Sequence, residues 1–152
     1  MQWHNLTFNR FTKVKDKIID FFKQHGDKRI TRDGINWIKQ ATPESFETPG
    51  TLVLCVVDQK VLVGVVIVAN YGIEESFIAV HKRYRNQDIG NKMVEYVVSS
   101  LGKIYGRIAM DNIPSIKICL ENGMVAFHLF EGPTGKPTLW LGGGNWNKAD
   151  VL

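Results

Sequence analysis

The chain has 152 residues, which is enough for one domain with a core of its own. Hydrophobic residues make up 44% and charged residues 22%, which is ordinary globular usage and excludes extensive disorder. The net charge is +4, but the lysines and arginines are dispersed, so we expect no nucleic-acid partner. The N-terminus lacks the apolar core of a signal peptide, and the longest apolar run, residues 61–69, is too short to span a bilayer. These features predict a cytoplasmic protein without membrane segments.

Two helices are predicted in the first 50 residues. Apolar residues at helical spacing indicate a helix over residues 11–24, ended near Gly26. Thr31 is a candidate N-cap for a second helix that continues to residue 40. Residues 43–50 are predicted to form a loop.

The remainder alternates between strands and helices. Residues 52–57 and 61–69 are rich in β-branched side chains and predict a hairpin with its turn at residues 58–60. Pro114 suits the first turn of a short helix, and Gly123 suits its C-terminal end. The further elements expected are a strand at 75–80, a helix at 89–101, a strand at 103–110, a helix at 114–122, and strands at 125–130 and 138–141. This order predicts a mixed α/β domain around one sheet, with a right-handed crossover between the strands at 75–80 and 103–110.

The sequence between residues 78 and 93 carries the strongest indication of function. A strand is predicted to end near Val80, a polar turn follows, and a helix begins at Ile89. Free backbone amides and the helix dipole at such an N-terminus favour an anion such as a pyrophosphate. Lys82 and Arg85 add positive charge, and Gly90 allows a ligand to approach the backbone closely. The alternative interpretation is an ordinary polar loop between a strand and a helix.

This passage resembles motif A of the GNAT superfamily of N-acetyltransferases. In that motif a hydrophobic-Ala-Val strand end precedes the pattern Gln/Arg-x-x-Gly-x-Gly/Ala. The matching residues are Ile78, Ala79, Val80, Arg85 and Gly90. Asp88 and Asn86 stand where glycines are common, and both residue types tolerate left-handed backbone. Because a carboxylate would repel a pyrophosphate, we expect the Asp88 side chain to point to solvent or to cap the helix.

A second resemblance lies downstream, at the spacing usual for the superfamily. Residues 111–124 are similar to motif B, which reads Asn-x-x-Ala/Ser, a short helix, then Gly-Phe. Asn112, Ser115 and Gly123 fit this pattern, while Met124 replaces the aromatic residue. The resemblance implies that Asn112 binds the pantetheine arm of acetyl-CoA. Helix propensity equally predicts an N-cap role for Asn112, and the two roles are compatible.

The resemblance covers roughly residues 52–130 and implies a GNAT-like fold. Such a fold has a mixed, mostly antiparallel central sheet flanked by helices, and a splayed parallel strand pair holds the cofactor, acetyl-CoA. It divides the single domain, residues 1–152, into a helical acceptor-side region at 1–50, a cofactor-binding core at 51–141 and a flexible tail at 142–152. The implied cofactor-binding residues are Ile78, Ala79, Val80, Arg85, Asn86, Gln87, Asp88, Ile89, Gly90, Asn91, Asn112 and Ser115.

The resemblance also implies two catalytic residues. Glu74 precedes Val80 by six positions, as the basic glutamate does in family members that use one on this strand. The alternative is a solvated residue at a strand start. Cys119 stands where the tyrosine that serves as general acid is usual, and a thiol with a pKa of about 8.5 could protonate a leaving thiolate. The alternative is a buried structural cysteine, with Tyr84, Tyr71 or solvent as the acid.

Together these features predict an N-acetyltransferase that moves an acetyl group directly from acetyl-CoA to a primary amine. The acceptor would be an amine-bearing small molecule or peptide, and no metal site is predicted. The alternative function is a catalytically weak or inactive acyl-CoA-binding regulatory module, which the aspartate in motif A and the missing tyrosine keep open. A sheet that ends in an exposed strand would also allow a homodimer.

Overall fold

The computed structural model describes all residues, 1–152, and contains two antiparallel sheets with five α-helices. Sheet A has the order β1-β2-β3-β4 and sheet B the order β5-β7-β6. The strands are β1 (Gln2–Asn5), β2 (Leu52–Asp58), β3 (Val61–Ala69), β4 (Glu75–Val80), β5 (Lys103–Ala109), β6 (Val125–Glu131) and β7 (Pro137–Gly144). The helices are α1 (Phe8–His25), α2 (Arg32–Gln40), α3 (Pro43–Glu47), α4 (Ile89–Leu101) and α5 (Ile113–Glu121).

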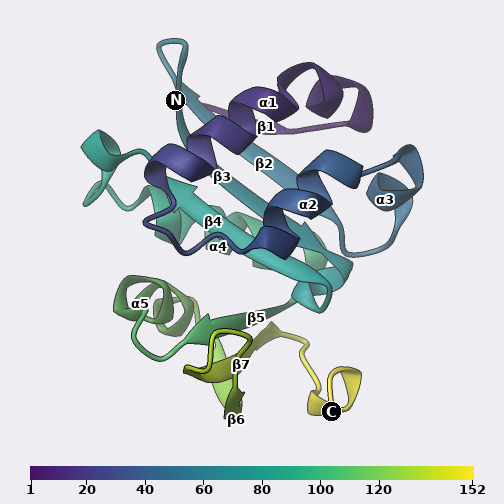
Figure 1. The fold of residues 1–152 in the computed structure, drawn as a ribbon, viewed down its shortest axis with the longest axis vertical. Helices are drawn as coiled ribbons and strands as arrows, with labels where there is room; N and C mark the ends of the chain where they lie inside the picture. The colour runs from purple at the N-terminus through teal and green to yellow at the C-terminus, as the bar shows by residue number, and fades with distance from the viewer.

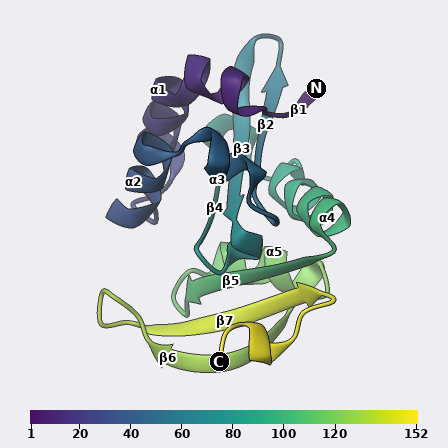
Figure 2. The ribbon, with the colours of Figure 1, turned by 90° about the vertical axis from the view of Figure 1, so that its right-hand side faces the viewer.

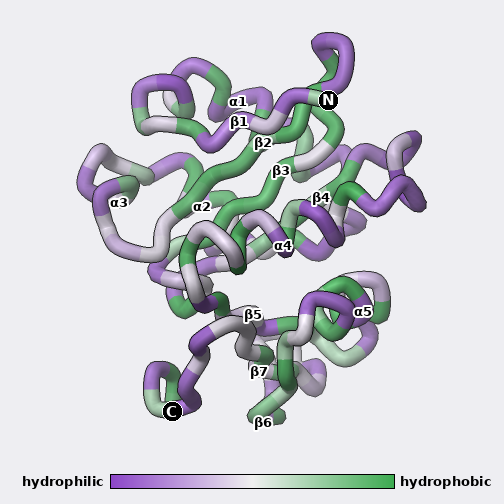
Figure 3. Tube along the Cα trace, turned by 180° about the vertical axis from the view of Figure 1, so that it is seen from behind, coloured by the Kyte–Doolittle hydropathy of each residue, from purple (hydrophilic) through white to green (hydrophobic).

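Sheet A lies between two layers of helices (Figure 2). Helices α1 and α2 cover one face, where Phe11, Ile18 and Ile38 are almost fully buried with side chains of the sheet. Helix α4 covers the other face and shares a second apolar cluster with α5 and sheet B, centred on Met93 and Leu141. Because both faces of the central strands are covered, β2 and β3 are nearly continuous hydrophobic runs (Figure 3).

Local signals account for the ends of most elements. The Thr7 and Thr31 hydroxyls accept hydrogen bonds from backbone amides in the first turns of α1 and α2, as N-caps do. The β2–β3 hairpin turns through Gln59 and Lys60, both at positive φ, which is the geometry of a tight type I′ turn. Helix α4 ends at Gly102, which has a φ of 81°.

Two elements and one feature of the sheet differ from the sequence expectation. Strand β1 was not predicted, because only Trp3 marks it as apolar and its pairing with β2 is long-range. Residues 43–47 form helix α3 rather than a loop, because Thr42 and Ser45 satisfy each other's backbone amides in a capping box. Instead of one sheet there are two, separated between β4 and β5.

The C-terminal residues fold back on sheet B. Strand β7 continues to Gly144, and a short 3₁₀ turn follows at Lys148–Asp150. Trp146 stacks on Phe127 with ring centroids 4.9 Å apart and lies so close to Gly142 that a Cβ there would be 2.7 Å from the indole. The hydroxyl of the fully buried Tyr105 accepts a hydrogen bond from the Asn147 amide at 2.8 Å and donates one to Asp150.

Strands β4 and β5 are neighbours that separate along their length. Where β4 begins, beside the middle of β5, Arg107 Nη2 donates to the Glu74 carbonyl at 2.9 Å, and a Cβ built on Gly106 would lie 3.7 Å from Ser76 Oγ. From there the two strands run in the same direction and diverge, so that their C-terminal ends lie apart (Figure 1). The expected fold class, with a splayed parallel pair, is therefore confirmed.

None of the helices combines the length and the apolar character that crossing a bilayer would require.

Candidate functional site

The edge of β4 that faces β5 has backbone groups without strand partners. The His81 amide donates to the Val63 carbonyl of β3, and pairing alternates along an antiparallel ladder. The backbone groups of Ile78 and Val80 therefore point toward β5, which bonds only to β7. The side chains of Ile78 and Val80 pack on the α4 side, whereas that of Ala79 is buried on the α1–α2 side. The second half of the strand thus presents an edge without strand partners, on which the Val80 carbonyl accepts a hydrogen bond from Arg85 Nε.

The segment from β4 to α4 leaves a run of backbone amides unpaired. No amide from Arg85 to Asn91 donates a hydrogen bond to another group of the protein. Asn86 and Asp88 both adopt φ of 66°, the left-handed conformation that glycines provide in the motif. The run ends in the first turn of α4, where free amides and the helix dipole together favour an anion. This arrangement is suited to binding a pyrophosphate through the backbone.

The Arg85 side chain is bound within the protein rather than presented to solvent. Its Nε donates to the Val80 carbonyl at 3.2 Å, Nη2 to the His25 carbonyl at 2.8 Å, and Nη1 to the Asp27 carboxylate at 2.7 Å. These bonds fasten the end of α1 to the end of β4. Lys82 and Arg83, which precede the run of free amides, and Lys92, which follows it, are instead exposed and form no ion pair.

The other predicted residues of this segment divide into exposed and packed ones. Asn86, Gln87 and Asp88 are exposed, and the Asp88 carboxylate makes no capping bond, so it faces solvent. Ile89 and Gly90 are buried, and a Cβ on Gly90 would lie 3.0 Å from Ile118 Cδ1 of α5.

Asn91 links the two helices that follow the splayed strands. Its side-chain Nδ2 donates to the Glu121 carboxylate at 2.7 Å, and its side-chain Oδ1 accepts from Asn122 Nδ2 at 2.6 Å. Because its side chain is occupied in this way, Asn91 offers a ligand its backbone amide.

At the end of β5 a side chain, rather than the backbone, is without a hydrogen-bond partner. Asn112 is the N-cap residue of α5 but makes no side-chain capping bond, and its half-buried amide has no partner in the protein. Ser115, one turn further, also makes no side-chain hydrogen bond and is half-buried. Asn112 therefore occupies the expected N-cap position of α5 but makes no capping bond, and its side-chain amide is available to a ligand.

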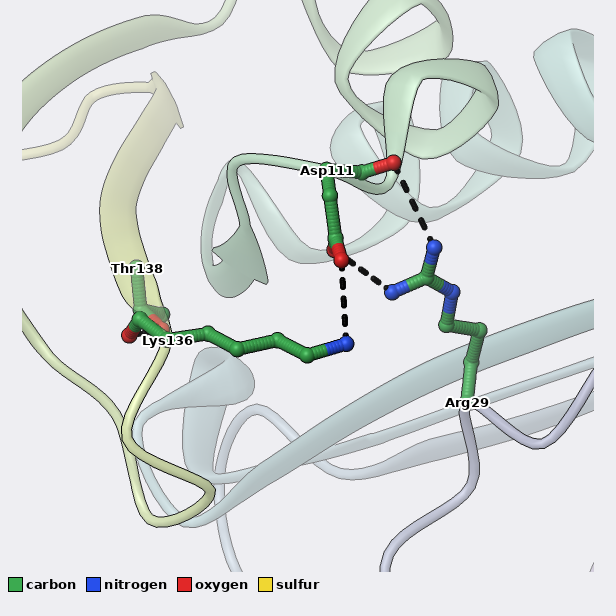
Figure 4. A network of polar contacts seen from close by, with 4 residues as sticks. All are labelled: Arg29, Asp111, Lys136 and Thr138. Carbon is green, nitrogen blue, oxygen red and sulfur yellow. Dashed lines mark hydrogen bonds and ion pairs between the residues drawn. The ribbon is translucent and has the colours of Figure 1, made fainter.

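The neighbouring Asp111 is the centre of a charged cluster (Figure 4). Arg29 Nη1 donates to its carboxylate at 2.8 Å, and Lys136 Nζ donates to the other carboxylate oxygen at 2.9 Å. These two hydrogen bonds, from Arg29 first, hold the pKa of Asp111 below its usual value. No motif in the sequence indicated this cluster, because Arg29 and Asp111 are 82 positions apart.

The two adjacent glutamates at the start of β4 occupy different environments. Glu74 precedes the strand and its side chain is exposed. Glu75 is half-buried, with its side chain on the face of Phe77 and Ala79 that α1 and α2 cover. Burial raises its pKa, while the nearby Arg107 opposes this effect and Asp33 reinforces it. Period-two alternation places Glu75 on the same face as the partly buried Phe77 and the buried Ala79, and this was the signal that could have singled it out.

Cys119 lies in the apolar cluster beneath α4, with only 8% of its surface exposed. Burial raises the pKa of its thiol to about 11. A thiol with this pKa stays protonated at neutral pH, as a general acid must be. Its burial nevertheless supports the alternative interpretation of Cys119 as a structural cysteine.

His25 and His81 form a stacked pair at the C-terminal end of β4. No sequence motif connects these two residues. The rings of His25 and His81 are 4.1 Å apart, and His25 Nδ1 accepts a hydrogen bond from the Lys82 amide at 3.1 Å. Burial, followed by electrostatic contributions from His81, Lys82 and Arg85, lowers the pKa of His25. The pair thus adds to the bonds that fix the end of α1 against the polar turn.

Comparison with known proteins gives a consistent picture. The model of the acetyltransferase (GNAT) family matches residues 16–124, while no curated protein matches the chain. Among solved structures, a ribosomal-protein-alanine N-acetyltransferase from Brucella melitensis is similar over 95% of this chain and 99% of its own, with 12% identity and a TM-score of 0.69. A GNAT-family acetyltransferase from Streptococcus pneumoniae is similar over 94% and 98%, with 14% identity and a TM-score of 0.67. A chimeric spermidine N-acetyltransferase from Vibrio cholerae is similar over 93% and 95%, with 15% identity and a TM-score of 0.64. At these identities the structures show a shared fold.

Proposed function

This chain belongs to the acetyltransferase (GNAT) family, and on that premise we propose that it is an acetyl-CoA-dependent N-acetyltransferase acting on a primary amine by direct transfer. The observation that carries the proposal is the run of unpaired amides from Arg85 to Asn91, at the end of a strand with a free edge. A pyrophosphate is the group of acetyl-CoA that such amides bind. The backbone of Ile78 and the amide of Val80, which have no strand partner, suit the extended pantetheine arm. The unpaired side-chain amide of Asn112 suits the polar groups of that arm.

Bound acetyl-CoA would supply the thioester from which the acetyl group is transferred. The chain's own residues would hold the reacting atoms together and accept the proton of the amine. Of the two glutamates, Glu75 is better suited to this than Glu74, because it is half-buried and its pKa is raised by burial. Backbone amides near Val80 would stabilise negative charge on the carbonyl oxygen during transfer. The departing thiolate would take its proton from solvent, since Cys119 is buried in the apolar cluster.

The acceptor is an amine-bearing small molecule or peptide in this proposal. The solved structures of similar fold are named for acceptors as different as ribosomal-protein alanine and spermidine, so the fold does not choose between them. A panel of polyamines and alanine-initiated peptides, with thiol release from acetyl-CoA as the readout, would identify the class. Binding of acetyl-CoA without thiol release for any amine would favour the regulatory module instead.

The role of the free amides is tested by two substitutions at one position. Gly90→Ala and Gly90→Pro add the same Cβ near Ile118, but only proline removes the amide hydrogen. Proline is tolerated in the first turn of a helix because that hydrogen has no intrahelical partner. We expect calorimetry to show that Gly90→Pro binds acetyl-CoA at least ~20-fold more weakly than Gly90→Ala. The reason is that proline removes one charge-assisted hydrogen bond to the pyrophosphate. Equal affinities would place the pyrophosphate elsewhere.

The base is tested by Glu75→Gln against Glu74→Gln. We expect kcat to fall ~100-fold in Glu75→Gln, a loss typical for removal of a general base. In Glu74→Gln we expect kcat to fall less than ~3-fold. Because the base acts deprotonated, the acidic limb of the kcat/KM profile should lie above the ordinary glutamate pKa of 4.5 and be absent in Glu75→Gln. A greater loss in Glu74→Gln would assign the base to Glu74.

The same carboxyl makes a prediction for stability. A pKa raised on folding means that the folded state holds this proton more tightly, so its stabilising contribution is complete below the unfolded pKa and is lost as pH rises through the folded pKa. Glu75→Gln should therefore melt slightly higher than the wild type at pH 8 but not at pH 4. A difference of the opposite sign would mean that Glu75 is stabilised as a carboxylate.

A further inference from the structure

The charged cluster of Arg29, Asp111 and Lys136 joins three segments that are remote in sequence. Arg29 lies between α1 and α2, Asp111 between β5 and α5, and Lys136 immediately before β7. One carboxylate accepts from both cations, at 2.8 Å and 2.9 Å (Figure 4). The cluster therefore connects the helical layer on sheet A with the β6–β7 hairpin of sheet B, at the end where β4 and β5 are apart.

The contacts reach the backbone of the turn as well as the Asp111 side chain. Arg29 Nη2 also donates to the Asp111 carbonyl at 3.3 Å, and the next amide, that of Asn112, donates to the Ala109 carbonyl at 2.9 Å. The Asn112 carbonyl in turn accepts from Ile116, in the first turn of α5, at 3.1 Å. The backbone on both sides of the Asn112 side chain is thus fixed, while the side-chain amide itself has no partner.

An isolated ion pair of this exposure would contribute little to stability. The side chains of Arg29, Asp111 and Lys136 are 36%, 53% and 49% exposed, and ion pairs at such exposed sites typically add little to stability. A geometric role suits the cluster better, since a bound carboxylate restricts the turn that carries Asn112. The hydrogen bonds to a shared carboxylate are also directional, which favours one conformation of the turn.

We infer that Asp111 is a positioning residue: held by Arg29 and Lys136, it orients the Asn112 amide toward the pantetheine arm of acetyl-CoA. The inference rests on the proposed function, because it assumes that Asn112 contacts that arm. In this inference the α1–α2 segment and the β6–β7 hairpin influence acetyl-CoA binding through Asp111, without contacting the cofactor. Displacing either segment on acceptor binding would change the affinity for acetyl-CoA through the same carboxylate.

A double-mutant cycle with Asp111→Ala and Asn112→Ala tests this mechanism, with acetyl-CoA affinity measured by calorimetry. If Asp111 acts through Asn112, Asp111→Ala should weaken binding ~5-fold in the wild type and less than ~1.5-fold in Asn112→Ala. A general structural effect would weaken both backgrounds equally. Asp16→Ala is the matched control, because Asp16 is exposed on α1 and forms no ion pair; it should leave the affinity unchanged.

Two further measurements separate the possible failures. Arg29→Met should reproduce the Asp111→Ala effect, and the ratio of wild-type to variant affinity should shrink in ~0.5 M salt as the cluster is screened. Equal weakening in both backgrounds, or none in either, overturns the positioning role. If Asn112→Ala leaves affinity unchanged while Gly90→Pro reduces it, acetyl-CoA binding stands and the positioning role falls. If neither reduces affinity, the proposed function falls.

Discussion

The two ends of the β4–β5 pair differ in the contacts that hold the surrounding chain in place. At the start of β4, the chain just before the strand lies close to the middle of β5, where Gly72 approaches the Tyr105 carbonyl. At this close end Arg107 Nη2 also donates a hydrogen bond to the Glu74 carbonyl. At the far end, polar side chains make the connections, through Arg85 on one side and Asp111 on the other. At the close end a Cβ on Gly72 would collide with the Tyr105 carbonyl oxygen, whereas the far end has free amides and an unpaired side chain. Substitution of Gly72 at the close end should therefore change stability, whereas substitutions at the free amides and at Asn112 should change ligand binding.

The largest effect is expected for Gly72→Ala at the close end. A Cβ there would lie 1.8 Å from the Tyr105 carbonyl oxygen, and the residue has a φ of 94°. We expect a loss of ~3 kcal/mol or more of unfolding free energy from overpacking and backbone strain. That loss corresponds to a fall in Tm of about 6–12 °C at roughly 2–4 °C per kcal/mol.

Gly102→Ala is the matched control for that substitution. Gly102 has a similar φ of 81°, but nothing lies within 4 Å of a Cβ built there. It should lose only ~1 kcal/mol, the cost of a left-handed alanine. Similar losses in both variants would mean that the close approach of the two strands is not tightly packed.

A smaller effect is expected when the polar clamp at the far end is removed. Arg85→Ala leaves the Val80 and His25 carbonyls and the Asp27 carboxylate without their donors. We expect a loss of ~2 kcal/mol in thermal unfolding, with a modest drop in acetyl-CoA affinity. Arg83→Ala, which removes an exposed and unpaired guanidinium, should lower the affinity ~2–5-fold in low salt without changing Tm. The reverse pattern would make Arg85 the phosphate ligand.

The smallest effect is expected at Asp88, whose exposed carboxylate lies beside the free amides. Asp88→Asn keeps a residue that tolerates a φ of 66° and removes the negative charge that repels a pyrophosphate. We expect acetyl-CoA to bind ~2–4-fold more tightly in calorimetry at low salt, with the gain lost at ~0.5 M salt. Weaker binding would indicate that the carboxylate organises the loop rather than opposing the anion.

The sequence predicted the parts of the fold that depend on neighbours in the chain. Helical periodicity placed α4 at residues 89–101, and β-branched runs with a short turn placed the β2–β3 hairpin. Motif spacing located the unpaired amides of residues 85–91, because a helix N-terminus and left-handed Asn or Asp are local features. The splayed strand pair came from family resemblance, since splaying is a relation between strands that periodicity does not encode.

Tertiary structure decided how the polar side chains of the site are used. Arg85 binds the end of α1 because α1 packs beside β4, and Glu75 rather than Glu74 is shielded because α2 covers that face of the strand. Arg29 reaches Asp111 across 82 positions of sequence. In the unfolded chain a long charged side chain can interact with many groups at similar energy. Its partner in the folded protein is fixed only when packing brings one of these groups close to it. The sequence determined where the backbone could bind an anion; the packing of distant segments determined which side chains remained free to help.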